Sequence, residues 1–194
     1  MEERISLLNL LPRMMVAGQA PLCEDVYRVI QHSGIGRAWM SRYFYQRHRQ
    51  AVRDILLNQD ETILLQHLIE TQQKTDIFLA IGAFRYQSAI VRAVSREQFL
   101  FWRHCLGDRI HSLLLASELK ITAEAEIVEQ PDAVAIRCEG FMELQHWWRT
   151  KEIAGFELLQ LMQPVSTGIE LSPSMLLTEQ MIQILKILFE QEGI

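Results

Sequence analysis

The stretch Gly34–Phe44, GIGRAWMSRYF, lies within a segment, residues 26–53, that contains six arginines and no carboxylate. The whole chain of 194 residues has a formal net charge of −5, and residues 118–194 hold 13 carboxylates against five Lys and Arg. Positive charge gathered in one part of an acidic chain predicts a basic contact surface. A solvated basic helix face is the alternative interpretation.

Two short helices separated by a glycine turn are expected around this stretch. Asp25 can cap a first helix that ends near Gln31, and Gly34 and Gly36 permit a tight turn into a second helix from Arg37 to about Phe44. A longer helix then follows to about Leu57. We expect six apolar residues to form one small core: Val26, Val29, Ile30, Ile35, Met40 and Phe44. This arrangement is a helix-turn-helix, in which Arg37, Ala38, Ser41 and Arg42 face outward toward bases or phosphates.

The spacing of these residues resembles the DNA-binding domain of the TetR family of bacterial transcriptional regulators. The shared frame runs without a gap through Asp25-Val26, Val29-Ile30, Ser33 to Ala38, Met40, Arg42 to Phe44 and Arg47. The resemblance implies a recognition helix over 37–43 and a phosphate contact at Arg47. Trp39 and Ser41 depart from the family, so either the DNA contacts are unusual or DNA binding has been lost. The implied DNA-binding residues are Asp25, Gly36, Arg37, Ala38, Trp39, Ser41, Arg42, Tyr43 and Arg47.

Helical periodicity continues through the rest of the chain and predicts an all-α protein of eight to ten helices. Ser95 and Gln98 form a capping box, and Gly107 should end that helix before another runs to about Leu119. Residues 121–138 could form a hairpin, but Pro131 and Asp132 favour a helix over 132–149. We expect a three-helix helix-turn-helix DNA-binding domain at 1–48, followed by a larger helical ligand-binding and dimerisation domain at 49–194.

The middle and later helices carry many aromatic and polar residues, which the family resemblance implies enclose a small-molecule pocket. A plain helix-bundle core is the alternative. Because Trp147 and Trp148 cannot both point inward from one narrow stripe, one of them is expected at an interface or a pocket wall. The expected ligand-binding residues are Phe84, Tyr86, Trp102, His104, Phe141, Trp147 and Trp148.

The last helix, expected from Pro173 to Phe189, has two apolar stripes and so predicts burial on two sides. Leu177, Met181, Ile184 and Leu188 form the first stripe, and Ile182, Leu185 and Phe189 form the second. One side should face the protomer's own core and the other a second protomer. The expected dimer-interface residues are Leu144, Trp148, Ile182, Leu185 and Phe189.

Catalytic and metal-binding patterns are missing from the sequence. No CxxC, phosphate loop, G-x-S-x-G or H-E-x-x-H occurs, and the three cysteines lie far apart. We therefore expect a protein that is not an enzyme and needs no cofactor or metal. The lack of a leader or long apolar span predicts a cytoplasmic location.

Together these features predict a homodimeric, ligand-responsive DNA-binding regulator, in particular a repressor on a pseudo-palindromic operator. The alternative is an all-helical adaptor or chaperone that binds protein and not DNA, with Trp39 and Trp147 as anchors. Residues 140–164 also resemble, over a short stretch, adaptor proteins of type III secretion machinery.

Overall fold

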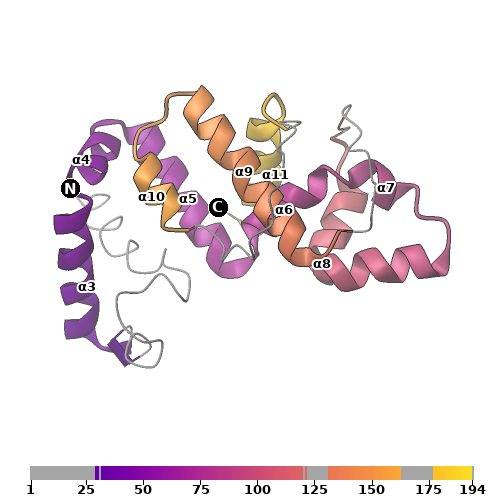
Figure 1. Ribbon diagram of the computed structural model, residues 1–194, viewed down its shortest axis with the longest axis horizontal. Helices are drawn as coiled ribbons and strands as arrows, with labels where there is room; N and C mark the ends of the chain where they lie inside the picture. Colours follow the sequence, from indigo (N-terminus) through magenta and orange to yellow (C-terminus); the bar gives the residue numbers. More distant parts are fainter. Residues whose placement is uncertain (1–28, 31, 120, 122–130, 163–176, 194) are drawn as a thin grey trace. The chain divides into compact units, whose positions relative to one another are not determined.

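The computed structural model describes residues 29–30, 32–119, 121, 131–162 and 177–193, and these residues form nine α-helices without a strand (Figure 1). The expected all-α fold is confirmed. Most of the segment that was ambiguous between hairpin and helix lies outside the described residues. The helices are α3 (Gly34–Arg47), α4 (Arg49–Leu57), α5 (Gln59–Lys74), α6 (Ile77–Phe84), α7 (Gln87–Val91), α8 (Arg96–Ala116), α9 (Ala133–Thr150), α10 (Phe156–Gln160) and α11 (Met181–Glu192).

The chain divides into two compact units. Residues 1–70 and 148–165 belong to the first unit, and residues 71–147 and 166–194 belong to the second. Helices α5 and α9 therefore contribute to both. The expected domain boundary at residue 48 falls between α3 and α4, inside the first unit, and as a division of function it stays a prediction.

In the first unit, α3 and α4 are joined by the single residue His48, and α10 contacts α4. The turn before α10 is held by polar contacts. The Trp148 indole donates to the Ala154 carbonyl at 3.1 Å, and the Ala154 N–H donates to the Glu61 carboxylate at 2.9 Å. Gly155 then approaches Ile55 of α4, and a Cβ there would lie 2.8 Å from the Ile55 Cδ1. These contacts fix α10 against the helix that follows α3.

The glycine turn expected at 34–36 is not formed. Helix α3 begins at Gly34, because the Ser33 hydroxyl accepts the Gly36 N–H at 3.3 Å and caps the helix three residues before the expected start. Serine is a strong N-cap, and its side chain outcompetes the tendency of glycine to break a helix. Gly36 instead allows a close contact, since a Cβ there would lie 2.3 Å from the Ile30 carbonyl oxygen.

The prediction of a small core around that turn is also wrong in part. Met40 and Phe44 are buried, but Val29 is 71% exposed and Ile35 is 86% exposed. Moving the helix start from residue 37 to residue 34 places Ile35 on the helix face opposite Met40 and Phe44. Val26 and the expected cap Asp25 lie outside the described residues.

The second unit is built around α6, all eight residues of which are buried. The Asp76 side chain caps α6 by accepting the Leu79 N–H at 3.1 Å. Helices α8 and α11 contact α6. Helix α9 comes closest, because a Cβ on Gly82 would lie 1.9 Å from the Ile136 carbonyl oxygen and one on Gly140 would lie 1.9 Å from that of Phe78. Glycine at both positions lets the two backbones touch.

Three local predictions about helix ends are confirmed. The Ser95 hydroxyl accepts the Gln98 N–H at 3.1 Å, Gly107 interrupts α8 with a φ of 74°, and the Asp132 carboxylate accepts the Ala135 N–H at 2.7 Å ahead of α9. The helix after Gly107 ends at Ala116 and not at Leu119.

The last helix begins later than expected. Ser172 and Pro173 lie outside the described residues, and residues 177–180 form a turn before α11 starts at Met181. A helix from Pro173 would use the Leu177 N–H within its own first turn. That N–H instead donates to the Glu143 carboxylate at 3.1 Å, a tertiary bond that competes with the helix.

We expect Gly140→Ala to lower the free energy of unfolding by about 1–3 kcal/mol or more, because the new methyl group collides with the α6 backbone. A backbone cannot move aside as a side chain can. Urea unfolding followed by circular dichroism measures this loss. Gly34→Ala is the matched control, since nothing lies within 4 Å of a Cβ there and alanine favours a helix by up to about 1 kcal/mol. Equal stability of the two variants would contradict the backbone contact.

Candidate interaction surface

Helix α3 presents a distinct outward face. Met40 and Phe44 are buried on one side, and α4 contacts the helix. The residues on the opposite side follow the helical period and are all exposed. This set, which we call the α3 outward face, consists of Ile35, Ala38, Trp39, Arg42 and Gln46.

A stacked row, in which neighbouring side chains touch, begins on this face at Trp39 and continues through Tyr43 to Arg47. The Trp39 ring is 50% exposed and stacks on Tyr43, with 5.7 Å between ring centroids and 16° between planes. The Arg47 guanidinium donates to the Tyr43 hydroxyl at 3.0 Å. Each residue stands four positions after the last, so one helical turn separates neighbours in the row. The indole is therefore held in place before any partner binds.

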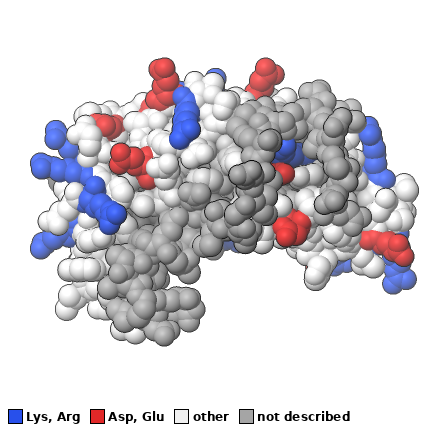
Figure 2. Space-filling model, viewed as in Figure 1, with Lys and Arg blue, Asp and Glu red and all other residues white. Residues whose placement is uncertain are grey.

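Five exposed arginines lie on α3 and α4, with Arg42 on the face itself, and the first carboxylate after residue 28 is Asp54. Figure 2 shows Lys and Arg side chains gathered over these two helices, with carboxylates beside them. Asp54 accepts a hydrogen bond from Gln50 at 2.7 Å. The predicted basic surface is thus present on these helices; its arginines are Arg37, Arg42, Arg47, Arg49 and Arg53.

His48 links this surface to α10. Its ring stacks on Phe44, with 6.4 Å between centroids, and its Nδ1 lies 3.7 Å from the Glu157 carboxylate. Both ring nitrogens are buried, and neither has a hydrogen-bond partner among the described residues. The junction between α3 and α4 therefore depends on ring packing more than on polar contacts.

The residues expected to bind DNA are placed unevenly. Most are exposed or half-exposed, including Arg37, Ala38 and Arg42, whereas Gly36 and Tyr43 are half-buried. The Ser41 hydroxyl oxygen is buried without a hydrogen-bond partner in the described part of the chain, so it does not point outward toward a phosphate as expected. Asp25 lies outside the described residues. Trp39 and Arg47 belong to the stacked row.

Most of the residues expected to bind a ligand are buried among other side chains, and their role in binding stays a prediction. Tyr86 packs on Trp102 with 5.7 Å between centroids, and Phe141 meets Phe78 edge-on at 5.3 Å. His104 is exposed, whereas the six aromatic residues of the set are buried: Phe84, Tyr86, Trp102, Phe141, Trp147 and Trp148.

The expectation that Trp147 or Trp148 lies at an interface or pocket wall is not met within the described structure. Trp147 is 4% exposed and Trp148 is 0% exposed. Helix α9 crosses the division of the chain between these residues, so Trp147 belongs to the second unit and Trp148 to the first. Adjacent tryptophans are both buried because each contributes to a different unit.

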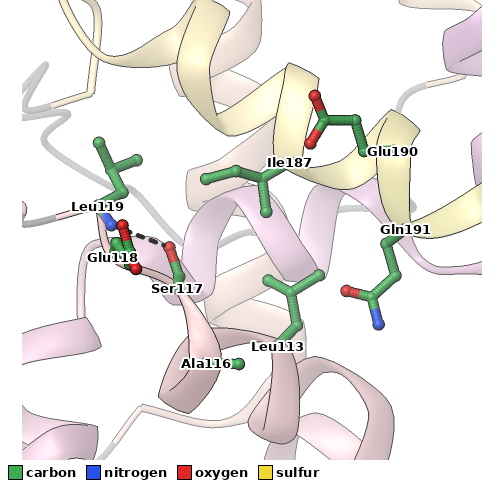
Figure 3. Close-up of a pocket in the computed structure, with 8 residues that line it drawn as sticks. All are labelled: Leu113, Ala116, Ser117, Glu118, Leu119, Ile187, Glu190 and Gln191. Atoms are coloured by element: carbon green, nitrogen blue, oxygen red, sulfur yellow. Dashed lines mark hydrogen bonds between the residues drawn. The ribbon is translucent and has the colours of Figure 1, made fainter.

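A hollow of about 490 Å³ lies elsewhere in the second unit (Figure 3). It is formed where the end of α8, the segment after it and the end of α11 meet. None of the expected ligand-binding residues lines it. The lining residues are Leu113, Ala116, Ser117, Glu118, Leu119, Ile187, Glu190 and Gln191.

A buried charged cluster joins α6, α7 and α9. Arg85 is 3.0 Å from the Glu143 carboxylate and 3.6 Å from that of Glu139, and the Tyr86 hydroxyl donates to Glu139 at 2.7 Å. Glu143 is fully buried and also accepts the Leu177 N–H. Its two oxygens therefore hold both a guanidinium and the backbone that leads into α11. The sequence contained no local signal for this cluster, because Arg85 and Glu143 stand 58 positions apart.

Burial controls the titration of this cluster. It raises the pKa of Glu139 above its usual range, with the charge of Glu143 acting in the same direction and the Tyr86 hydrogen bond and Arg85 opposing it. Burial, followed by the hydrogen bond to Glu139, also raises the pKa of Tyr86. The cluster contains two carboxyl groups against one guanidinium, so a proton on Glu139 reduces its excess of negative charge.

The residues expected at a dimer interface are mostly covered within the chain. Leu144, Trp148 and Leu185 are buried, Phe189 is half-buried and Ile182 is 49% exposed. The first apolar stripe of α11 is buried as expected, whereas the second leaves mainly Ile182 at the surface. The dimer stays a prediction.

No group of three or more metal-binding side chains occurs in the described part of the chain. Burial raises the pKa of the Cys105 and Cys138 thiols, which favours the unreactive protonated form. Among the helices described, none is long and apolar enough to cross a membrane. Comparisons with protein-family models, curated proteins and solved structures found no match.

We expect Glu139→Gln to change the pH dependence of stability. A raised folded pKa means that Glu139 contributes stability at acid pH, and that this contribution is lost as the pH rises through the folded pKa. Glutamine keeps a hydrogen-bond acceptor for the Tyr86 hydroxyl but carries no charge. The melting temperature of the variant should therefore be close to that of the wild type near pH 4.5 and higher than that of the wild type near pH 8. Calorimetry at both pH values tests this. A constant difference in melting temperature would contradict it.

Proposed function

We propose that this chain is an all-helical adaptor that binds an acidic protein through the α3 outward face. The observation that carries the proposal is the exposure of two large apolar residues, 86% for Ile35 and 50% for Trp39, on a helix that also carries three exposed arginines. Contiguous exposed apolar residues with a polar rim are typical of protein interaction sites. Covering the Ile35 side chain alone would contribute about 1.5–3 kcal/mol.

The composition of this face matches that of protein-binding hot spots, which are rich in Trp, Tyr and Arg. Trp39 stacks on Tyr43, and Arg47 donates a hydrogen bond to the Tyr43 hydroxyl, so the indole has few accessible conformations before binding. A side chain that is already ordered loses less conformational entropy on association. Trp39 is therefore the expected anchor.

The arginines specify the charge of the partner. Five of them are exposed on α3 and α4, and the described residues before Asp54 contain no carboxylate to offset them. An acidic partner would be attracted over a distance of about 8–10 Å at physiological salt, which raises the association rate.

A DNA-binding regulator is the second candidate, and the same five arginines favour it. In this interpretation the chain is a ligand-responsive homodimeric repressor of the TetR type, and α3 lies in the major groove of a pseudo-palindromic operator. Two observations place it second. The break between the helices lies at Ser33 and not at the expected glycines, which belong to α3, and the outward face offers Ile35 and Ala38 beside Arg42 and Gln46, so part of it has no side-chain hydrogen-bonding group for base edges.

In-cell photo-cross-linking separates the two candidates. With p-benzoylphenylalanine in place of Ile35, we expect an adduct with an acidic protein that resists nuclease and is removed by protease. Trp39→Ala should abolish most of it, because the anchor is lost. The matched control carries the same probe in place of Val94, which is 95% exposed in the second unit and should give no such adduct. A nuclease-sensitive adduct at position 35 would instead favour the regulator, and no adduct there would contradict the adaptor.

The regulator makes its own quantitative prediction. Arg37→Ala or Arg42→Ala should weaken specific DNA binding by about 1–3 kcal/mol, and Arg47→Ala should weaken binding to all sequences and flatten its salt dependence. Fluorescence anisotropy with duplexes selected from genomic DNA measures both. The regulator also requires a dimer, which sedimentation equilibrium of the wild type and of Ile182→Glu would test. A monomer at micromolar concentration, or no enriched duplex at moderate salt, would exclude it.

A further inference from the structure

The hollow at the ends of α8 and α11 combines an apolar centre with negative charge at its edge. Figure 3 shows Ile187 extending from α11 toward Leu113 of α8, with Glu118 on one side. Leu113 is buried, whereas Glu118, Glu190 and Gln191 are exposed at the rim. None of the eight lining residues is a Lys, Arg or His.

The backbone adds to this negative character. Ala116, the last residue of α8, and Gln191, one residue before the end of α11, both line the hollow, so the C-terminal turns of two helices lie beside it. The last carbonyl groups of a helix carry about half a negative charge in total. Two helix ends and two carboxylates therefore produce a negative potential beside apolar side chains.

We propose that this hollow binds a small organic cation, an amine or guanidine attached to an apolar body. The apolar body would contact Leu113, Leu119 and Ile187. The cationic group would lie at the rim, between the Glu118 and Glu190 carboxylates and the helix ends. The proposal does not depend on what α3 binds.

The size of the hollow fits a small molecule. A volume of about 490 Å³ falls within the roughly 300–1,000 Å³ of sites that bind drug-sized ligands. An anion would be repelled by the two glutamates, and a neutral apolar molecule would gain only the contact with the apolar residues. A cation with an apolar body gains binding free energy both from the apolar residues, which form the floor of the hollow, and from the carboxylates at its rim.

A charge series on the full chain tests the proposal. The probes are 2-phenylethylamine, 2-phenylethanol and 3-phenylpropanoate, which share an aromatic body and differ in charge. Methyl NMR of Leu113, Leu119 and Ile187 reports binding. We expect the amine to shift these resonances with the highest affinity, the alcohol to bind more weakly and the carboxylate not to bind.

Variants of the rim and the floor identify the site. Glu118→Gln with Glu190→Gln should weaken amine binding about tenfold, since the variant loses two exposed ion pairs, each of which contributes weakly. Ala116→Trp should fill the hollow and abolish binding. Glu97→Gln is the control, because Glu97 is an exposed carboxylate at the opposite end of α8 and its loss should have no effect.

Four outcomes would overturn the proposal. The first two are no shift of the methyl resonances at 10 mM amine and equal affinity for the amine and the alcohol. The third is an unchanged affinity for the amine in the Glu118→Gln, Glu190→Gln variant. The fourth is tighter binding of Nα-acetyl-lysine-N-methylamide, which keeps the side-chain ammonium, than of 2-phenylethylamine. The last would assign the site to a side chain of a partner protein and not to a free amine.

Discussion

The backbone contact between α6 and α9 determines where the buried charges of the second unit lie. Gly82 and Gly140 have no side chains to separate the helices, and each faces a carbonyl oxygen of the other helix. Arg85 follows Gly82 by three residues, as Glu143 follows Gly140. The close approach thus brings the guanidinium and the carboxylate to 3.0 Å in a buried place. Parting the helices would leave each charge buried and unpaired, which costs several kcal/mol.

This contact also reaches the C-terminal part of the chain. Arg85 holds one oxygen of Glu143 and so fixes the orientation of the carboxylate, whose other oxygen accepts the Leu177 N–H. That bond sets a turn ahead of Met181, after which α11 contacts α6. The end of α11 in turn lines the hollow. One pair of glycines therefore influences a hollow lined by residues far away in the sequence.

The sequence predicts those parts of the structure that depend on near neighbours. The caps at Ser95 and Asp132 and the break at Gly107 follow from three or four residues each, and all are confirmed. At Gly34 and Gly36 two local signals conflict, and the Ser33 hydroxyl prevails over the glycines. The buried cluster and the hollow each combine distant segments, so no local pattern indicates them. The arginines of α3 and α4 were predicted as a surface, but their relation to Ile35 depends on where the helix begins.

The start of α3 matters because charge alone does not distinguish one polyanion from another. Arginines raise the association rate with DNA and with an acidic protein through the same long-range attraction. Apolar surface behaves differently, because it gains free energy only where a partner covers it with apolar groups. A helix that began at Arg37 would have left Ile35 in a turn and its outward face mainly polar. Beginning at Gly34 places Ile35 one turn from Trp39 on that face, so in the proposed adaptor the apolar pair, and not the arginine count, would select the partner.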